Sequence, residues 1–199
     1  AATAKVHAAA ISRRIAQFCT SPYLLPSSTV ERMVIHARGT RQLRKGRASE
    51  VSRIYHVTAV TLGRQPVFLD LLNARDVILS LRLQHELGSA SMLCFVVMPD
   101  HLHWLFVLGG ERQLDTVVAA VKTRSARLIN ARSCRYGSVW GRGYYDRAIR
   151  YDEDVLTVAR YIVANPVRSG LVPSVGYYPH WDAVWVGARR CGQQLRPFD

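Results

Sequence analysis

The chain has 199 residues, with 27 Lys and Arg against 14 Asp and Glu, which gives a formal net charge of +13. Hydrophobic residues make up 49% of the sequence, enough for one sizeable core, so wholesale disorder is excluded. Because no run reaches the roughly 18 apolar residues of a membrane-spanning helix, an integral membrane protein is excluded as well. The positive charge favours a polyanionic partner, either nucleic acid or an anionic membrane surface.

In chain order, the first feature is a basic N-terminal extension over residues 1–43, which we expect to be poorly ordered. At its end the sequence RGTRQLRKGR is rich in arginine and contains two glycines, a composition typical of a solvated arm that contacts phosphates. The phosphate contacts predicted from this block are Arg44, Lys45 and Arg47.

The regular pattern begins after this arm and alternates between strand-like and helical spacing. β-Branched and aromatic runs indicate strands, apolar residues three and four apart indicate helices, and Gly and Pro clusters separate them. The elements predicted in this way are a strand over 52–61, a helix over 67–87, strands over 92–98 and 101–108, a helix over 114–129, a strand over 140–149 and a helix over 152–164. This β-α-β-β-α-β order followed by a helix predicts an α+β, ferredoxin-like (RRM-like) fold, in which an antiparallel sheet carries helices on one face.

The four cysteines, Cys19, Cys94, Cys134 and Cys191, are far apart and form no CxxC pair. A disulfide-stapled secreted domain would be shorter and richer in cysteine. We therefore expect reduced thiols in a cytoplasmic protein, with Cys94 in the core because it lies in an apolar run.

The segment MPDHLHWLFVL contains two histidines, His101 and His103, separated by one residue in a predicted strand. Residues two apart in a strand project from the same face, while Leu102 points to the other side. Two adjacent imidazoles can hold a divalent metal ion. A pair of strand histidines without a metal is an equally open interpretation of this motif taken alone.

The segment VARYIVANPVRSGLV places Tyr161 and Asn165 four residues apart, on one face of the last predicted helix. A phenol and an amide oxygen on that face could both approach a metal. A packing tyrosine and an Asn-Pro helix terminus remain the alternative, because both are common.

Taken together, MPDHLHWLF, GYYDRAIR and ARYIVANPVRSGLV resemble the REP-associated tyrosine transposases, a branch of the single-tyrosine HUH endonucleases. The sequences RKGR…IYHVT…GRQPVF and YYPHWDAVW resemble the start and the end of the same domain. The resemblance therefore covers residues 44–185, leaving a C-terminal tail over residues 186–199.

The resemblance implies an enzyme that binds single-stranded DNA with a repeat (REP-type) hairpin, cuts it beside the hairpin and transfers the strand. It assigns His101 and His103 to the metal, Mg²⁺ or Mn²⁺, Tyr161 to the nucleophile on the C-terminal helix, and Asn165 to the third metal ligand. Other branches carry Gln where Asn165 stands, and Pro166 ends the helix there. The reaction implied passes through a 5′-phosphotyrosine and leaves a free 3′-hydroxyl.

Other residues are predicted more weakly. His56 lies in the strand expected beside the histidine pair and could contact it from behind. Tyr144 and Tyr145 could stack on bases or pack in the core, and either is a rival nucleophile. Phosphate contacts are expected from the basic stretch between the third strand and the last helix, at Lys122, Arg124, Arg127, Arg142, Arg147 and Arg150.

Two other functions fit the same residues. An RRM-like sheet with a basic arm could bind structured nucleic acid without cutting it. A metal-dependent hydrolase using activated water would need the histidine pair but not Tyr161. We expect no membrane partner, a monomer rather than a dimer, and a cytoplasmic protein that associates with the nucleoid when it is bound to DNA.

Overall fold

The computed structural model describes residues 49–110, 112–150 and 154–185. Within the chain, Gly46–Val184 forms a compact unit of its own. The basic extension over residues 1–43, the predicted phosphate contacts Arg44, Lys45 and Arg47, and the tail over residues 186–199 lie outside the described residues.

The secondary structure alternates as the sequence pattern predicts, with one additional strand at the end. The strands are β1 (Ile54–Val60), β2 (Ala90–Met98), β3 (His101–Leu108), β4 (Tyr145–Ala148) and β5 (Trp181–Ala183). The α-helices are α2 (Leu71–Glu86), α3 (Leu114–Arg132), α4 (Val155–Val163) and α5 (Asn165–Arg168), and short 3₁₀ turns form η1 (Leu62–Arg64), η2 (Val67–Leu69) and η3 (Val175–Tyr177).

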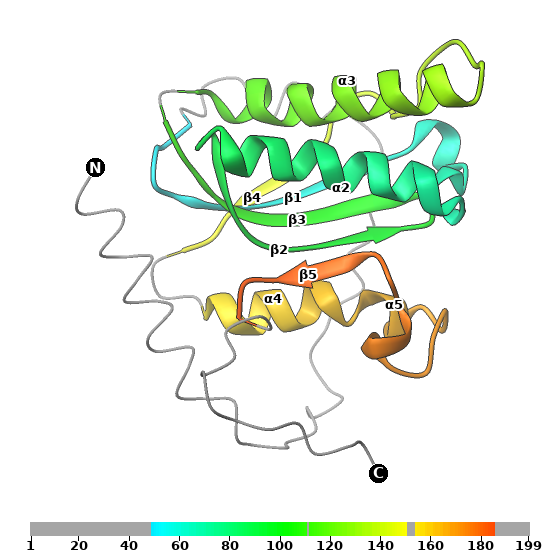
Figure 1. The fold of residues 1–199 in the computed structure, drawn as a ribbon. Coiled ribbons are helices and arrows are strands. Elements are labelled where there is room, and N and C mark those ends of the chain that lie inside the picture. The colour runs from blue at the N-terminus through cyan, green and yellow to red at the C-terminus, as the bar shows by residue number, and fades with distance from the viewer. Residues whose placement is uncertain (1–48, 111, 151–153, 186–199) are drawn as a thin grey trace, which may run out of the picture. The chain divides into compact units, whose positions relative to one another are not determined.

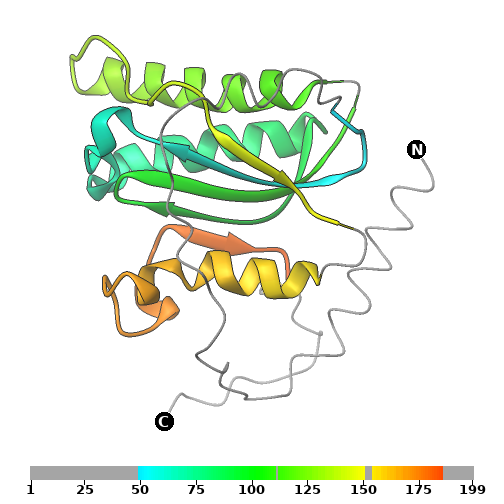
Figure 2. The ribbon, with the colours of Figure 1, turned by 180° about the vertical axis from the view of Figure 1, so that it is seen from behind.

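The five strands form one antiparallel sheet in the order β4-β1-β3-β2-β5. The predicted α+β, ferredoxin-like arrangement is confirmed, because β1 and β3 lie side by side in the middle with β4 and β2 outside them. In Figure 1 the helices α2 and α3 cover one side of this sheet and α4 lies on the other, and the view from behind in Figure 2 agrees.

The main hydrophobic core lies between the sheet and the pair α2 and α3. Val57, Trp104 and Phe95 are neighbours across β1, β3 and β2, and all three belong to this core. Apolar side chains of both helices complete it, among them Val77 and Val117. We call this side of the sheet the core face.

Because side chains alternate along a strand, the residues between these core positions point to the opposite side. Cys94, Val96 and Leu105 are buried there, and α4 contacts β2, β3 and β5 and buries Val158 and Ile162. We call this side the histidine face, because it also carries His101 and His103.

None of the helices in the described part of the chain has the length and apolar character needed to span a membrane.

Some element boundaries differ from those predicted. The predicted strand over 140–149 shrinks to β4, because Trp140 makes only an isolated bridge to Thr61. The predicted helix over 67–87 begins at Leu71 instead, because the Asp70 carboxylate accepts hydrogen bonds from the backbone N–H of Leu72 and Asn73. Asp154 likewise caps α4 rather than lying in its first turn.

Candidate active site

The two histidines of the HxH motif lie side by side at the start of β3. Their side chains share the histidine face, whereas Leu102 between them packs into the core. The rings meet edge to face, and the two Nε2 atoms are 3.2 Å apart. Strand alternation therefore brings one nitrogen of each ring to the same point.

The other nitrogen of His103 contacts β1. Thr58 is the register partner of His103, and its Oγ1 lies 3.0 Å from His103 Nδ1, while His56 Nε2 lies 3.2 Å from the same atom. If the Nδ1–H of His103 donates to the Thr58 hydroxyl, Nε2 keeps the lone pair. His56, predicted to contact the pair, is thus placed directly behind His103.

Burial keeps both of these rings neutral. The pKa of His103 is lowered well below 6.5 by burial and then by the nearby His101 and His56. Burial, with a further contribution from the positive charge of Arg147, lowers the pKa of His56 to about 4. At neutral pH the His103 Nε2 is therefore free of a proton and able to bind a cation, provided that Nδ1 carries the hydrogen.

His101 contacts a carboxylate through its second nitrogen. Its Nδ1 lies 2.5 Å from Asp100 Oδ1, and Asp100 Oδ2 accepts a hydrogen bond of 2.9 Å from Arg64 Nη1. Burial opposes ionisation of Asp100, but the hydrogen bonds and charges of His101 and Arg64 outweigh it and lower its pKa. Neither Asp100 nor Arg64 is among the residues predicted from the sequence. A carboxylate immediately before the HxH motif is the signal that could have identified Asp100.

The histidine pair fits a divalent metal ion. Two ligands about 2.1 Å from an octahedral ion, at right angles to each other, lie about 3.0 Å apart, close to the 3.2 Å between the Nε2 atoms of His101 and His103. In the part of the chain that the structure describes, no three His, Cys, Asp or Glu side chains form a metal-binding group. The two imidazoles thus supply two ligand positions.

Tyr161 lies on α4, on the same side of the sheet as the histidines. Its side chain is 37% exposed, and the guanidinium carbon of Arg168 lies 4.2 Å from the centre of its ring. Among the described residues, no hydrogen bond or ring contact joins Tyr161 to His101 or His103. The fold therefore places the phenol of Tyr161 and the two histidines on the same side of the sheet, without a direct contact between them.

Asn165 follows the end of α4 and begins α5. Its Nδ2 donates hydrogen bonds to the carbonyl oxygens of Tyr161 at 3.0 Å and Ile162 at 2.9 Å. The helix was predicted to run to residue 164, but α4 ends at Val163 and the chain turns into α5 with Pro166 in its first turn. With its amide nitrogen used in this way, Asn165 has Oδ1 as its remaining ligand atom.

The predicted phosphate contacts divide between the two sides of the sheet. Arg147 is the register partner of His56 and thus belongs to the histidine face, and Arg142 and Arg150 are exposed on either side of β4. Arg124 and Arg127 are exposed on α3, which covers the opposite face. Lys122 donates hydrogen bonds to the carbonyls of Gly141 and Gly143, and so links α3 to the segment before β4.

The two neighbouring tyrosines at the start of β4 have different surroundings. Tyr144 is buried in the core between the sheet and α2 and α3, so it cannot reach DNA without local unfolding. Tyr145 is half-buried on the histidine face, because its register partner is Thr58, which in turn pairs with His103. Of the two, only Tyr145 shares a face with the histidines.

Comparisons with known proteins agree with the resemblance expected from the motifs. The family model "Transposase IS200 like" matches residues 50–165. A Haemophilus influenzae (strain ATCC 51907 / DSM 11121 / KW20 / Rd) protein described as a putative REP-associated tyrosine transposase is 26% identical over an alignment of 138 residues, and the match covers 64% of this chain and 77% of that protein. A solved structure of a REP-associated tyrosine transposase bound to a REP hairpin is similar in fold, with 20% identity and a TM-score of 0.54, over 68% of this chain and 79% of that one. The recognition made from the sequence is confirmed.

Proposed function

Because this chain belongs to the IS200-like transposase family, a family of DNA-cleaving transposases, we propose that it cuts and rejoins single-stranded DNA beside repeat hairpins with Tyr161 as nucleophile. The observation that carries this proposal is the convergence of the two Nε2 atoms of His101 and His103 on the side of the sheet where α4 carries Tyr161. The similar protein solved with a REP hairpin supports the choice of substrate.

In the proposed reaction the phenolic oxygen of Tyr161 attacks the scissile phosphorus. A bond forms between that oxygen and phosphorus, the bond from phosphorus to the 3′ oxygen breaks, and the proton lost by the phenol is balanced by one gained at the 3′ oxygen. The products are a 5′-phosphotyrosine and a free 3′-hydroxyl. Because the linkage is still a phosphodiester, a 3′-hydroxyl can reverse the step, which allows strand transfer.

One of the residues that contact the ring of Tyr161 carries a positive charge. The Arg168 guanidinium, 4.2 Å from the ring centre of Tyr161, stabilises negative charge that develops on the ring oxygen. Asn165 holds the end of α4 through its two hydrogen bonds, which use the amide nitrogen and leave Oδ1 as the atom that could bind a metal ion. These two residues, the first and the last of α5, therefore both contact Tyr161.

The proposed metal site consists of His101, His103 and Asn165. A Mg²⁺ or Mn²⁺ ion bound there would polarise the scissile phosphate and neutralise charge in the transition state. The neutral His103 offers its Nε2 lone pair without first losing a proton. Its hydrogen-bonded Nδ1 keeps the ring from rotating.

We propose that the DNA strand follows the part of the histidine face near β4. Arg147 lies there beside His56, and Arg142 and Arg150 flank the same strand. The arm residues Arg44, Lys45 and Arg47 are proposed as further phosphate contacts. The chain is proposed to act as a monomer, with Tyr161 in cis, in the cytoplasm and at the nucleoid when DNA is bound.

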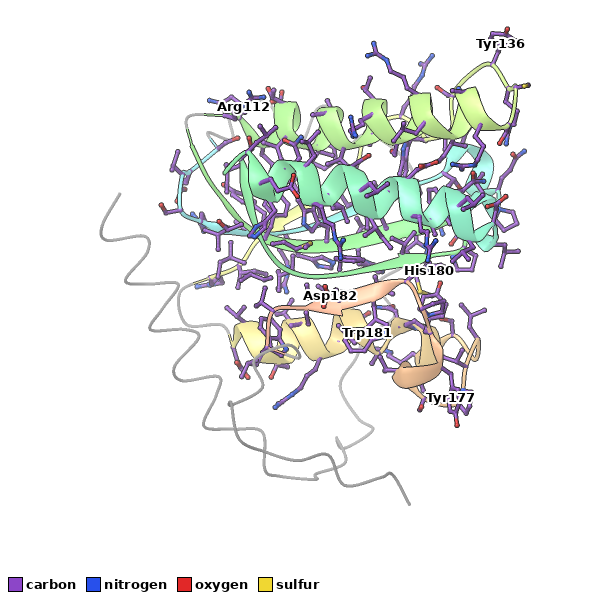
Figure 3. All side chains as sticks on the ribbon, viewed as in Figure 1. Arg112, Tyr136, Tyr177, His180, Trp181 and Asp182 are labelled. Carbon is purple, nitrogen blue, oxygen red and sulfur yellow. The ribbon has the colours of Figure 1, made fainter. Side chains whose placement is uncertain are left out.

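A denaturing gel tests the proposal directly. End-labelled single-stranded hairpin oligonucleotides are incubated with the full chain and Mn²⁺ or Mg²⁺. Wild type should give a band of protein size plus DNA, and Tyr161→Phe and His101→Ala should give none. Tyr136→Phe is the matched control, because Tyr136 is fully exposed at the loop after α3, as Figure 3 shows.

Three results would overturn the proposal in different ways. An adduct that persists in Tyr161→Phe would assign the nucleophile to another tyrosine, with Tyr145 next to be tested. Cleavage without any adduct would indicate a hydrolase that uses activated water. Retarded but uncut DNA across many hairpins, with no effect of metal, would indicate a binding module without catalysis.

A further inference from the structure

Asp100 lies in the turn between β2 and β3 and joins two side chains from different parts of the chain. One carboxylate oxygen contacts His101 Nδ1 at 2.5 Å, and the other accepts a hydrogen bond from Arg64 Nη1 at 2.9 Å. We propose that Asp100 and Arg64 are a positioning pair that fixes the ring of His101 with its hydrogen on Nδ1. This inference rests on the proposed role of His101 as a metal ligand.

The chemistry of imidazole explains why such a pair is needed. A neutral imidazole carries one hydrogen, and the nitrogen without it is the one that can bind a cation. A carboxylate beside Nδ1 favours the form with hydrogen on that atom and holds the ring in one orientation. The Nε2 lone pair of His101 is then directed to the point 3.2 Å from His103 Nε2.

The two histidines differ in how their second nitrogen is held. His103 is buried, and neutral groups, the Thr58 hydroxyl and the His56 ring, contact its Nδ1. His101 is less buried, with 18% of its side chain exposed, and a charged acceptor holds its Nδ1 more firmly than a hydroxyl would. Of the two histidines, only the partially exposed His101 has a carboxylate beside its Nδ1.

The backbone around Arg64 places its side chain at a conformational cost. Arg64 has φ of 54° directly after Gly63 at 60°, a left-handed conformation that is unfavourable for a residue with a side chain. Such a conformation persists only where surrounding contacts determine it, and it is concentrated at functional sites. In this position the Arg64 guanidinium reaches Asp100.

A buried threonine fixes the two members of the pair relative to each other. Thr61 donates its backbone N–H to the carbonyl of Asp100 at 2.9 Å, and its Oγ1 lies 2.7 Å from the carbonyl of Gln65. The backbone N–H of Arg64 in turn donates to the carbonyl of Thr61 at 3.2 Å. The segment that carries Arg64 and the turn that carries Asp100 are thereby connected to one residue at the end of β1.

The first test measures metal binding in the absence of DNA, with the full chain and Mn²⁺ followed by electron paramagnetic resonance. Asp100→Asn should weaken Mn²⁺ binding about tenfold, the range seen when the partner of a metal-binding histidine is removed. Arg64→Gln should weaken it less, by about threefold, because the carboxylate remains. The matched controls are Glu86→Gln and Arg82→Gln. Both residues are exposed to solvent on α2, which covers the face of the sheet opposite the histidines, so both variants should bind Mn²⁺ as wild type does.

The second test reads the position of the hydrogen by ¹⁵N NMR of the metal-free protein. Wild type should show His101 with hydrogen on Nδ1, and Asp100→Ala should show a mixture with hydrogen on Nε2. Circular dichroism establishes that each variant is folded. A loss of metal affinity with an unchanged hydrogen position would indicate a change of charge alone and would overturn the positioning role.

The outcomes separate this inference from the proposed reaction. If Asp100→Asn binds Mn²⁺ as tightly as wild type and His101 keeps its Nδ1 hydrogen in Asp100→Ala, the positioning pair is wrong even if wild type forms the DNA adduct. If the variants change both readouts but no protein forms an adduct, the pair stands and the proposed reaction is wrong. If wild type binds no Mn²⁺, the pair's role at a metal site is overturned.

Discussion

The two faces of the sheet have opposite characters, although the same strands build both. On β3, Leu102, Trp104 and Phe106 point into the hydrophobic core between the sheet and the pair α2 and α3. His101 and His103 alternate with these residues and point to the other face. One strand thus carries core side chains on one face and the two proposed metal ligands on the other, and each set can be changed separately.

The faces also differ in how their polar groups are satisfied. On the histidine face, hydrogen bonds connect His103 to Thr58 and His56, and connect His101 to Asp100. Most buried polar groups in proteins have such partners. The histidine face is therefore a preorganised polar network beside a small apolar contact with α4, and the core face is a packed interior.

The largest expected effect comes from a substitution on the histidine face. His103→Ala removes one of the two converging Nε2 atoms, so we expect adduct formation to fall by at least about a hundredfold, since even removing the partner of a metal-binding histidine costs about 10- to 100-fold. The denaturing gel measures this loss, and urea unfolding establishes that the variant is folded. A variant with undiminished adduct formation would remove His103 from the site.

The adjacent substitution on the core face should have the opposite result. Leu102 is almost fully buried, so Leu102→Ala should lower the free energy of unfolding by about 3 kcal/mol. Adduct formation per folded molecule should stay close to that of wild type, because Leu102 points away from the histidines. Urea denaturation combined with the gel gives both numbers. Equal loss of activity in Leu102→Ala and His103→Ala would mean that the two faces are not separable.

A smaller effect is expected from the contact behind His103. Thr58→Val keeps the shape of the side chain but removes the hydroxyl 3.0 Å from His103 Nδ1. The loss of one hydrogen bond, about 1 kcal/mol, corresponds to about fivefold weaker Mn²⁺ binding. Thr123→Val, an exposed position on α3, is the control and should bind as wild type does. Unchanged binding in Thr58→Val would assign the orientation of His103 to His56 alone.

The smallest expected effect concerns His180, a buried histidine before β5 that Figure 3 labels. Burial, and then the positive charge of Arg75, lowers its pKa. As pH falls below 6.5, the unfolded chain takes up a proton at this ring that the folded chain resists, so this residue makes stability decline. His180→Gln should therefore lose less stability than wild type between pH 7.5 and 5.5 in urea unfolding. Identical declines would show that His180 contributes nothing.

The sequence predicts those parts of the fold that local periodicity determines. The alternation in β3 predicted that His101 and His103 share one face, as they do. The spacing of Tyr161 and Asn165 predicted a single helix for both, but Asn165 lies beyond the end of α4 and begins α5, because the chain turns before Pro166. The strand β5 was not predicted, because its three residues are too short to show alternation and it is defined by pairing with β2.

Contacts between distant segments are the part that could not be predicted. Arg64 and Asp100 are 36 residues apart, and only the pairing of β1 with β3 brings their segments together. Lys122 was expected at a phosphate, but its ammonium donates to two backbone carbonyls, a contact that depends on how the segment before β4 packs on α3. A basic residue in the sequence does not reveal which acceptor the fold will offer.

The central claim is that Tyr161 forms the covalent bond to DNA, and mass spectrometry of the adduct tests it most directly. Trypsin cuts after Arg160 and Arg168, so the peptide over residues 161–168 contains one tyrosine, whereas Tyr144 and Tyr145 fall in a separate peptide over residues 143–147. After nuclease digestion of the DNA, tandem mass spectrometry should find the nucleotide remnant on Tyr161. A remnant on the peptide over residues 143–147, or an adduct without any modified tyrosine, would contradict it.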